Sequence, residues 1–378
     1  MKPIVAGALI LMLVGACATI PRFAVQGTFG GRPIDTTVDS PAAAALVEGR
    51  AMPPAFEDFL AEPGLPDTVR LKTLAAATSP DAATLALLAK IDRAAPGAAL
   101  RARYAAFRAR LSAGGRSQWP VLAACLSGAG LPEVHFVPGW FYRRNPSTGA
   151  DFAAQRRVLN ALGFTHRLIE IDEDGAVEVN AQAIAAHLRR ARAGASGIVL
   201  VSTSKGGPET AHALGRLMSA DEATAVAAWI NIGGILGGSP LADTATTWPI
   251  SWLARLALSW DGIDARASLP SLTSAAAARR LAVERMPGHL RIVNYVGLPV
   301  SGQITAEALD GYRRLRRFGP NDGLTPVAEQ WRHGGDVIAA PGLDHFYRDP
   351  EIDTATAALA FTVFEALGHD RPATCVRP

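Results

Sequence analysis

This sequence of 378 residues contains few cysteines, no large excess of positive or negative charge, and few long hydrophobic runs. Three cysteines are too few for a disulfide-stapled miniprotein or a cysteine-rich zinc module. Lysine and arginine number 37 against 34 aspartates and glutamates, a balance without the clustered basic face that nucleic-acid binding requires. Metal-binding motifs of the His-Glu-x-x-His type and dinucleotide or P-loop signatures are also missing. We therefore expect no nucleic-acid partner, no metal and no cofactor.

Apolar residues, in contrast, are abundant and make up 49% of the chain. This fraction is ample for a folded core, which excludes a mainly disordered protein. Part of the mean hydropathy of +0.16 comes from the first residues, MKPIVAGALILMLVGAC. The apolar run at 4–14 is too short to cross a bilayer, which takes about 20 apolar residues. Its charged, apolar and small-residue layout is that of an export signal.

The end of this stretch, from Leu13 to Cys17, resembles the bacterial lipoprotein box. In that motif the cysteine thiol is lipidated and becomes the new N-terminus. The resemblance implies a signal peptide over 1–16 and an exported protein, lipid-anchored at Cys17 to a bacterial membrane and facing the periplasm or the exterior. An ordinary signal peptide cut at a neighbouring alanine is the alternative. The spacing does not tell whether the other two cysteines form a disulfide, these being Cys125 and Cys375.

The rest of the chain divides by composition into three parts. Residues 17–40 are rich in Gly, Thr, Pro and Arg and predict an extended tether or a segment lying along the surface. Residues 41–116 are alanine-rich, with apolar residues at helical spacing, and predict an appendage of three short helices whose role is open. From 117 to 378 short β runs alternate with amphipathic helices. This alternation predicts a mostly parallel sheet with helices on both faces, whose sites lie at the carboxyl ends of the strands.

The predicted elements of this third part can be placed by residue number. Strands are expected at 134–137, 167–171, 198–201, 226–232, 290–296 and 336–339. Helices are expected at 151–162, 181–193 and about 353–367.

The sharpest motif is STSKG, in which Ser204 follows the strand at 198–201 and precedes a helix that runs to about 218. A serine on such a turn adopts strained dihedrals and needs small residues two positions away on each side, here Ser202 and Gly206. The positive end of the following helix favours a developing oxyanion. The motif resembles the nucleophile elbow of the α/β-hydrolase family, with Ser202 where glycine is usual. Taken alone, it also fits a phosphate-binding or purely structural turn.

Two later motifs fit the acid and the histidine that follow the nucleophile in this family. The stretch GPNDGLTP, which contains Asp322, resembles the acid loop of bacterial lipases, although an aspartate beside glycine is also ordinary turn chemistry. His345 follows the strand at 336–339 and precedes the last helix, where the general base of the family lies. The resemblance thus implies a triad of Ser204, Asp322 and His345.

Other titratable residues fit the triad less well. His333 is expected on a helix before the last strand, and His212 on the helix after the nucleophile. His135 lies inside a strand, where a core histidine is the commoner case. Asp344 adjoins His345, and neighbouring side chains on an extended loop point apart.

The resemblance also implies an oxyanion hole built from two backbone N–H groups. One belongs to Lys205, the residue after the nucleophile. The other comes from the loop FVPGWF after an early strand, where Trp140 is the expected donor and Phe141 the second choice. Pro138 stands where the family often has histidine, and a plain Pro-Gly turn would look the same.

An insertion at about 244–288 predicts a helical cap. Large apolar residues recur there at every fourth position and form one stripe on a helix, namely Trp248, Trp252, Leu256 and Trp260. We interpret Trp248, Trp252 and Leu256 as substrate-binding residues of a lid. Packing against the body of the protein or stacking on sugars would give the same stripe.

The family resemblance covers residues 130–368. It implies an α/β-hydrolase fold with a helical cap and an N-terminal helical appendage. It also implies a serine hydrolase that cleaves small-molecule or lipid carboxylic esters, like lipases and esterases, through an acyl-enzyme and without a cofactor. Two alternatives stay open: hydrolysis of another acyl bond (thioester, amide or polyester), or a catalytically silent hydrolase fold used for binding in the cell envelope. The oligomeric state is open too.

Overall fold

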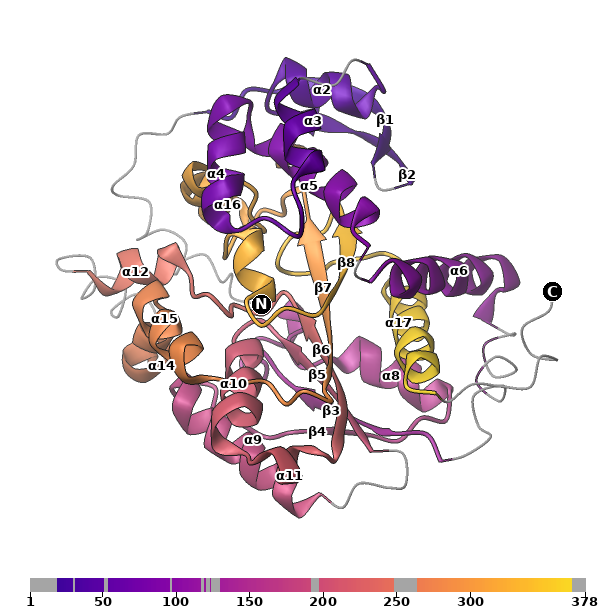
Figure 1. Cartoon of the computed structure of the whole chain (residues 1–378), viewed down its shortest axis with the longest axis vertical. Coiled ribbons are helices and arrows are strands. Elements are labelled where there is room, and N and C mark those ends of the chain that lie inside the picture. Colours follow the sequence, from indigo (N-terminus) through magenta and orange to yellow (C-terminus); the bar gives the residue numbers. More distant parts are fainter. Residues whose placement is uncertain are drawn as a thin grey trace.

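The computed structural model describes residues 19–29, 31–50, 54–95, 97–116, 119, 123, 130–191, 197–247 and 264–368 (Figure 1). Its centre is a six-stranded parallel sheet in the order β4-β3-β5-β6-β7-β8. The strands are β3 (Glu133–Val137), β4 (His166–Leu168), β5 (Ile198–Thr203), β6 (Val226–Ile232), β7 (Arg291–Leu298) and β8 (Asp336–Pro341).

All six strands occur where the sequence predicts them, and the predicted mostly parallel sheet is confirmed. The inner strand β5 carries buried apolar side chains on both of its faces, as expected for a strand covered by helices on each side. The strand expected at 167–171 is shorter, because β4 is an edge strand that pairs only with β3 and leaves the ladder after Leu168.

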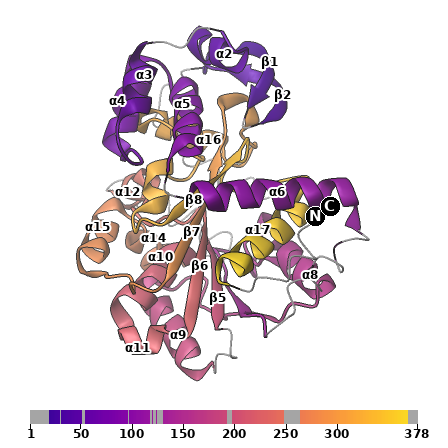
Figure 2. The same cartoon turned by 45° about the vertical axis from the view of Figure 1, so that its right-hand side comes forward.

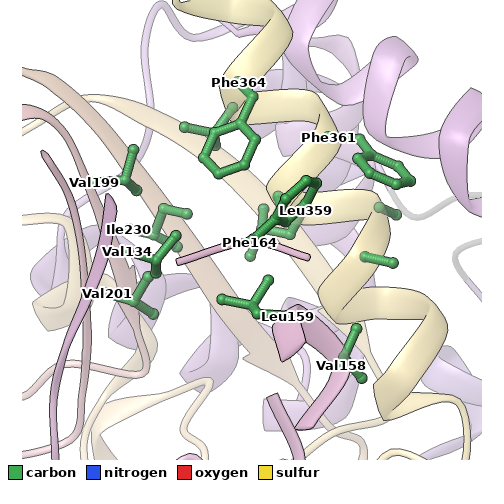
Figure 3. Close-up of a cluster of buried hydrophobic side chains, with 14 of the residues drawn as sticks. Val134, Val158, Leu159, Phe164, Val199, Val201, Ile230, Leu359, Phe361 and Phe364 are labelled. Carbon is green, nitrogen blue, oxygen red and sulfur yellow. The ribbon is translucent and has the colours of Figure 1, made fainter. Parts of the chain in front are cut away.

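One face of the sheet is covered by α8 (Ala153–Ala161) and α17 (Ile352–Ala366), with α6 (Ala98–Gly114) packed on α17 (Figure 2). The odd-numbered residues of β5, Val199 and Val201, point into this layer. Figure 3 shows them facing the aromatic and aliphatic side chains of α17 and α8. This layer is the largest hydrophobic cluster described in the chain.

The other face is covered by α9 (Val177–Arg190) and α10 (Gly206–His212). A π-helical turn, η4 (Ala213–Leu217), continues α10, and the short helix α11 (Ala220–Ala223) precedes β6. The even-numbered residues of β5, Ile198 and Leu200, pack here, as the two-residue repeat of a strand requires. The helix predicted to run to about 218 is therefore present, with its last turn widened.

The remaining short elements lie beyond the carboxyl ends of the strands or connect to the next strand. They are η3 (Pro146–Thr148), α12 (Pro240–Thr246), α14 (Ala265–Ser271), α15 (Ser274–Val283), η5 (Ser301–Gln303), α16 (Leu309–Leu315), η6 (Arg316–Phe318) and η7 (Val327–Trp331). The middle of the predicted cap is outside the described residues, and with it Trp248, Trp252, Leu256 and Trp260. Outside them too are Cys17, Cys125 and Cys375.

The N-terminal part differs from the prediction. Residues expected as a tether contain an antiparallel hairpin of β1 (Phe23–Phe29) and β2 (Arg32–Val38). Five helices follow where three were expected: α2 (Pro41–Val47), α3 (Pro54–Ala61), α4 (Thr68–Ala77), α5 (Pro80–Arg93) and α6. Prolines begin several of these helices. Pro41 and Pro80 each follow a serine N-cap, a position that tolerates the missing N–H.

The N-terminal part packs directly on the sheet. The helices α2 to α5 share one hydrophobic cluster with Val296 and Leu298 of β7 and Val337 of β8. Figure 1 shows these elements, in indigo, above the ends of β7 and β8. Within the described ranges, none of the helices is both long and apolar enough to cross a bilayer.

Candidate active site

The turn after β5 is strained, as the motif predicts. Ser204 has a φ of 52°, in the left-handed region that non-glycine residues rarely adopt. A Cβ atom on Gly206 would lie 2.6 Å from the carbonyl oxygen of Pro138, and one on Gly207 would lie 2.7 Å from Cα of Gly234. The turn is therefore clamped between the loops after β3 and β6, and only glycine fits on its helical side.

Ser202, the departure from the usual glycine, has a structural partner. Its side chain is fully buried, and its Oγ accepts a hydrogen bond of 2.8 Å from Nε1 of Trp229 on β6. The indole N–H would otherwise be a buried donor without an acceptor, which costs about 1–3 kcal/mol. The sequence showed that Ser202 is small enough for the turn but did not indicate this contact.

Ser204, His345 and Asp322 lie in one hydrogen-bonded line. His345 Nε2 is 2.9 Å from Ser204 Oγ, and His345 Nδ1 is 2.7 Å from Asp322 Oδ2. The backbone N–H of His345 also donates to the carbonyl of Asp322, at 2.9 Å, which ties the two loops together. The three residues follow β5, β7 and β8, and the parallel sheet brings the ends of these strands to one edge.

The carboxylate of Asp322 is fully buried and saturated with donors. Its Oδ1 accepts from the backbone N–H groups of Leu324 and Thr325, both at 2.9 Å, and its Oδ2 also accepts from Gln330 Nε2 at 2.8 Å. These bonds fix the orientation of the carboxylate toward His345. Gln330, on η7, was not foreseen from the sequence, because a glutamine eight residues away carries no recognisable signal.

The same geometry sets the protonation of His345. Burial disfavours the imidazolium, but the charge of Asp322 and its hydrogen bond outweigh burial, so the pKa of His345 is raised above its ordinary value. The imidazole is therefore a stronger base than a free histidine. At the same time the bond to Asp322 holds Nδ1 as the donor and leaves Nε2 to face Ser204.

The two backbone groups expected to form an oxyanion hole flank Ser204. The loop of Gly139 and Trp140 packs against the turn, since a Cβ atom on Gly139 would lie 3.3 Å from Cβ of Ser204. In the described part of the chain, the N–H groups of Trp140, Phe141 and Lys205 donate to no carbonyl. All three residues line the cavity described below.

Behind the turn lies a buried charged network that the sequence did not reveal. The ammonium of Lys205 donates to Glu209 one helical turn later, and both side chains are almost completely buried. Glu209 Oε1 also accepts from Asn180 Nδ2 of α9 at 2.7 Å, and Asn180 Nδ2 donates to the carbonyl of Asp172 at 2.8 Å. Burial raises the pKa of Glu209 to about 7. The network joins α10, and with it the turn, to α9.

The rival histidines lie away from Ser204. His135 Nε2 is 3.0 Å from Glu133, and its Nδ1 is 3.1 Å from His187, so it is a core histidine with partners. His212 and His333 lie on either side of Glu284, each 2.9 Å from one of its oxygens. His333 follows η7 in a turn and is not on a helix as predicted, since η7 ends at Trp331. Among the described residues, no cluster of His, Cys, Asp and Glu has the arrangement of a metal site.

Ser204 and His345 line a cavity of about 610 Å³. Most of its walls are apolar. They come from the loops after β3, β6, β7 and β8, from the start of α8 and from the described parts of the predicted cap. Leu269 and Leu272, within and just after α14, supply apolar surface that sequence reasoning had assigned only to the tryptophan stripe. Charged residues line the cavity as well, among them Arg314 of α16 and the pair of Arg348 and Glu307, whose side chains are 2.8 Å apart.

No protein-family model and no curated protein matches this sequence. Solved structures do. A metagenomic carboxyl esterase, MGS0156, superposes with a TM-score of 0.51 over 64% of this chain and 76% of its own, at 23% sequence identity. The fold is that of the α/β-hydrolases. The mature form of the Bacillus licheniformis lipase BlEst2 gives a TM-score of 0.49 at 23% identity, over 63% of this chain and 91% of its own. The superposition on MGS0156, together with the parallel sheet, confirms the α/β-hydrolase fold predicted from the sequence.

Proposed function

We propose that this protein is a serine hydrolase that cleaves carboxylic esters through an acyl-enzyme on Ser204. The observation that carries the proposal is the hydrogen-bonded line from Asp322 through His345 to Ser204 at the wall of an apolar cavity. A structural neighbour with the same fold is described as a carboxyl esterase.

The first half of the reaction would proceed as follows. His345 Nε2 takes the proton of the Ser204 hydroxyl as Oγ attacks the ester carbonyl carbon. Asp322 stabilises the imidazolium, and the N–H groups of Lys205 and Trp140 donate to the oxyanion. His345 then gives the proton to the leaving alkoxide, and the alcohol departs.

The second half uses the same groups. A water molecule takes the place of the alcohol, gives a proton to His345 and attacks the acyl carbon with its oxygen. The tetrahedral intermediate collapses, Ser204 recovers its proton, and the acid leaves. The apolar walls support an ester with hydrocarbon parts as substrate, because burying apolar surface contributes about 25 cal/mol per Å² to binding.

The test compares hydrolysis of nitrophenyl acetate and butyrate by the purified protein and by Ser204→Ala. We expect turnover by the wild type and a loss of at least about 10³-fold in kcat in the variant. Ser219→Ala, at the N-cap of α11, is the matched control and is expected to keep the activity. Equal turnover by wild type and Ser204→Ala would exclude Ser204 as the nucleophile.

We also propose that the protein is exported and lipid-anchored at Cys17, a proposal supported only by the motif LVGAC. Metabolic labelling with a palmitate analogue in a bacterial host should mark the wild type and not Cys17→Ser. Labelling of both proteins would refute the anchor at this position.

A further inference from the structure

A second, smaller cavity of about 60 Å³ lies inside the layer between the sheet and the helices α8 and α17. Its walls include Val201 of β5, Ile230 of β6, Leu159 of α8 and Leu359 of α17. Figure 3 shows these four side chains converging from the two sides of the layer. We call this space the side cavity.

Two residues that line the side cavity are more accessible than neighbouring residues on the same strand or helix. Val201 keeps 7% of its surface accessible, whereas Leu200 beside it, on the opposite face, keeps 0%. On α17, Ala360 keeps 8%, whereas Ala358 keeps 0%. Val201 and Ala360 both line the side cavity. These residues of the hydrophobic layer thus keep some accessible surface, although close packing is the rule in protein interiors and voids are few.

The side cavity meets the active-site cavity at four residues that line both, namely Gln155, Ile232, Tyr347 and Ile352. Tyr347 is held in place, because its hydroxyl donates to the carbonyl of Tyr295 at 3.0 Å and accepts from the N–H of Gly297 at 2.8 Å. The side chain of Gln155 has no hydrogen bond to any described residue. Of these four boundary residues, Tyr347 is held by two hydrogen bonds, whereas the side chain of Gln155 is held by none to a described residue.

The side cavity offers water few unpaired polar groups to bind. Its other polar side chains are already hydrogen-bonded: Thr356 Oγ1 donates to the carbonyl of Ile352 at 2.7 Å, and the hydroxyl of Tyr295 is 3.2 Å from that of Tyr104. Cavities without free polar partners stay dry and take up apolar molecules. The volume holds roughly four water-sized groups, and so roughly four methylenes in a row.

We propose that the side cavity binds the end of an unbranched hydrocarbon chain of the substrate, which passes Gln155 from the active-site cavity. This proposal rests on the proposed ester hydrolysis. A narrow apolar space selects a linear chain and excludes rings and branched ends. The chain belongs either to the acyl group or to the alcohol, and the two arms of the experiment below distinguish these sources.

The experiment narrows the side cavity with Ala360→Leu and uses Ala366→Leu as a matched control. Ala366 is a half-buried residue at the end of the same helix and does not line the cavity. One arm measures kcat/KM for nitrophenyl esters from acetate to decanoate. The other arm measures kcat/KM for acetate esters of straight-chain alcohols from methanol to octanol.

If the acyl chain occupies the side cavity, Ala360→Leu lowers the kcat/KM for octanoate relative to that for acetate by about tenfold or more. The reason is that each buried methylene contributes about 0.8 kcal/mol. If the alcohol chain occupies the side cavity, the kcat/KM for octyl acetate relative to that for methyl acetate falls instead. Ala366→Leu leaves both ratios unchanged. Unchanged ratios in a folded Ala360→Leu variant would overturn the proposal.

Two further measurements keep the outcomes separate. Should Ala360→Leu not fold, Leu359→Ala enlarges the cavity and is expected to move the preferred chain to greater length, and an unmoved preference refutes the proposal. If the wild type hydrolyses no ester, the proposed function fails. A binding measurement then tests the side cavity independently of catalysis. Octanol should then raise the melting temperature of the wild type more than cyclooctanol does, and equal shifts would contradict the cavity as a linear-chain site.

Discussion

At the scale of single residues, the candidate site depends on how each polar group is satisfied. Asp322 accepts bonds from two backbone N–H groups and Gln330 in addition to His345. These bonds hold the carboxylate in one orientation. Burial lowers the pKa of His345, but the charge of Asp322 and its hydrogen bond outweigh burial, so the pKa is raised.

Asp322→Asn tests this dependence. The neutral amide no longer favours the imidazolium and can present its own N–H to Nδ1, which would fix the wrong tautomer, so we expect kcat to fall by about 10⁴-fold. In the wild type, His345 must be neutral to act as a base. Because its pKa is raised above 6.5, kcat/KM should fall as the pH drops through a value above 6.5. In Asp322→Asn, the fall of the residual kcat/KM at low pH should shift to a lower pH.

The pH profiles of kcat/KM for both proteins are the measurement. A wild-type limb below 6.5, or a limb that does not move in Asp322→Asn, would contradict the assignment of His345 and Asp322.

The sequence allowed the convergence of Ser204, Asp322 and His345 to be predicted, because each follows a buried β run and parallel strands end at one edge. It did not allow the supporting residues to be predicted. Ser202 finds Trp229 only because β5 pairs with β6, and Asn180 reaches Glu209 only because α9 packs on α10. Contacts of this kind depend on tertiary packing and leave no local pattern.

At the scale of elements, the turn after β5 packs closely against two other loops, those after β3 and β6. Gly206 lets the loop after β3 approach closely, and this loop carries the proposed second oxyanion donor, Trp140. The position of that donor therefore depends on the missing side chain at Gly206.

Gly206→Ala should separate these loops. The new Cβ atom would lie 2.6 Å from the carbonyl oxygen of Pro138 and 2.8 Å from that of Val137, so backbone must move. We expect kcat to fall by about 10²–10³-fold, the usual effect of losing one oxyanion donor. Steady-state kinetics, with circular dichroism to verify folding, provide the measurement.

Gly288→Ala is the control for this substitution, since a Cβ atom there would meet nothing within 4 Å. A folded Gly206→Ala variant with wild-type kcat would show that the contact with the loop after β3 does not position a donor.

At the scale of the whole molecule, a buried polar network around Asp81 joins the N-terminal part to η5, α16 and η6, the short elements that follow β7. Asp81 Oδ1 accepts from the hydroxyl of Tyr312 at 2.8 Å and from the N–H of Ser301 at 2.9 Å, and Oδ2 accepts from the N–H of Asp39 at 2.8 Å. Arg316 pairs with Asp39 at 3.0 Å. The composition of residues 17–116 could not predict this, because the partners lie more than 200 positions away.

The network makes the stability of the protein depend on pH. Burial, and then the nearby charge of Asp39, raise the pKa of Asp81 to about 6 from 3.8. A raised carboxyl pKa means that the stabilisation is complete below about 3.8 and is lost as the pH rises through about 6. The wild type should therefore lose up to about 3 kcal/mol relative to Asp81→Asn between these pH values.

Urea unfolding of both proteins at several pH values from 3.8 to 7 measures this difference. Parallel stability curves of the wild type and Asp81→Asn would mean that folding does not change the pKa of Asp81, which would contradict this prediction.

The central claim, a nucleophilic Ser204 in an ester hydrolase, is tested most directly by a fluorophosphonate that labels activated serines. Mass spectrometry of the digested adduct should place a single phosphonyl group on the peptide containing Ser204, and Ser204→Ala should remain unlabelled. An adduct on another residue, or no adduct on the folded wild-type protein, would contradict the account.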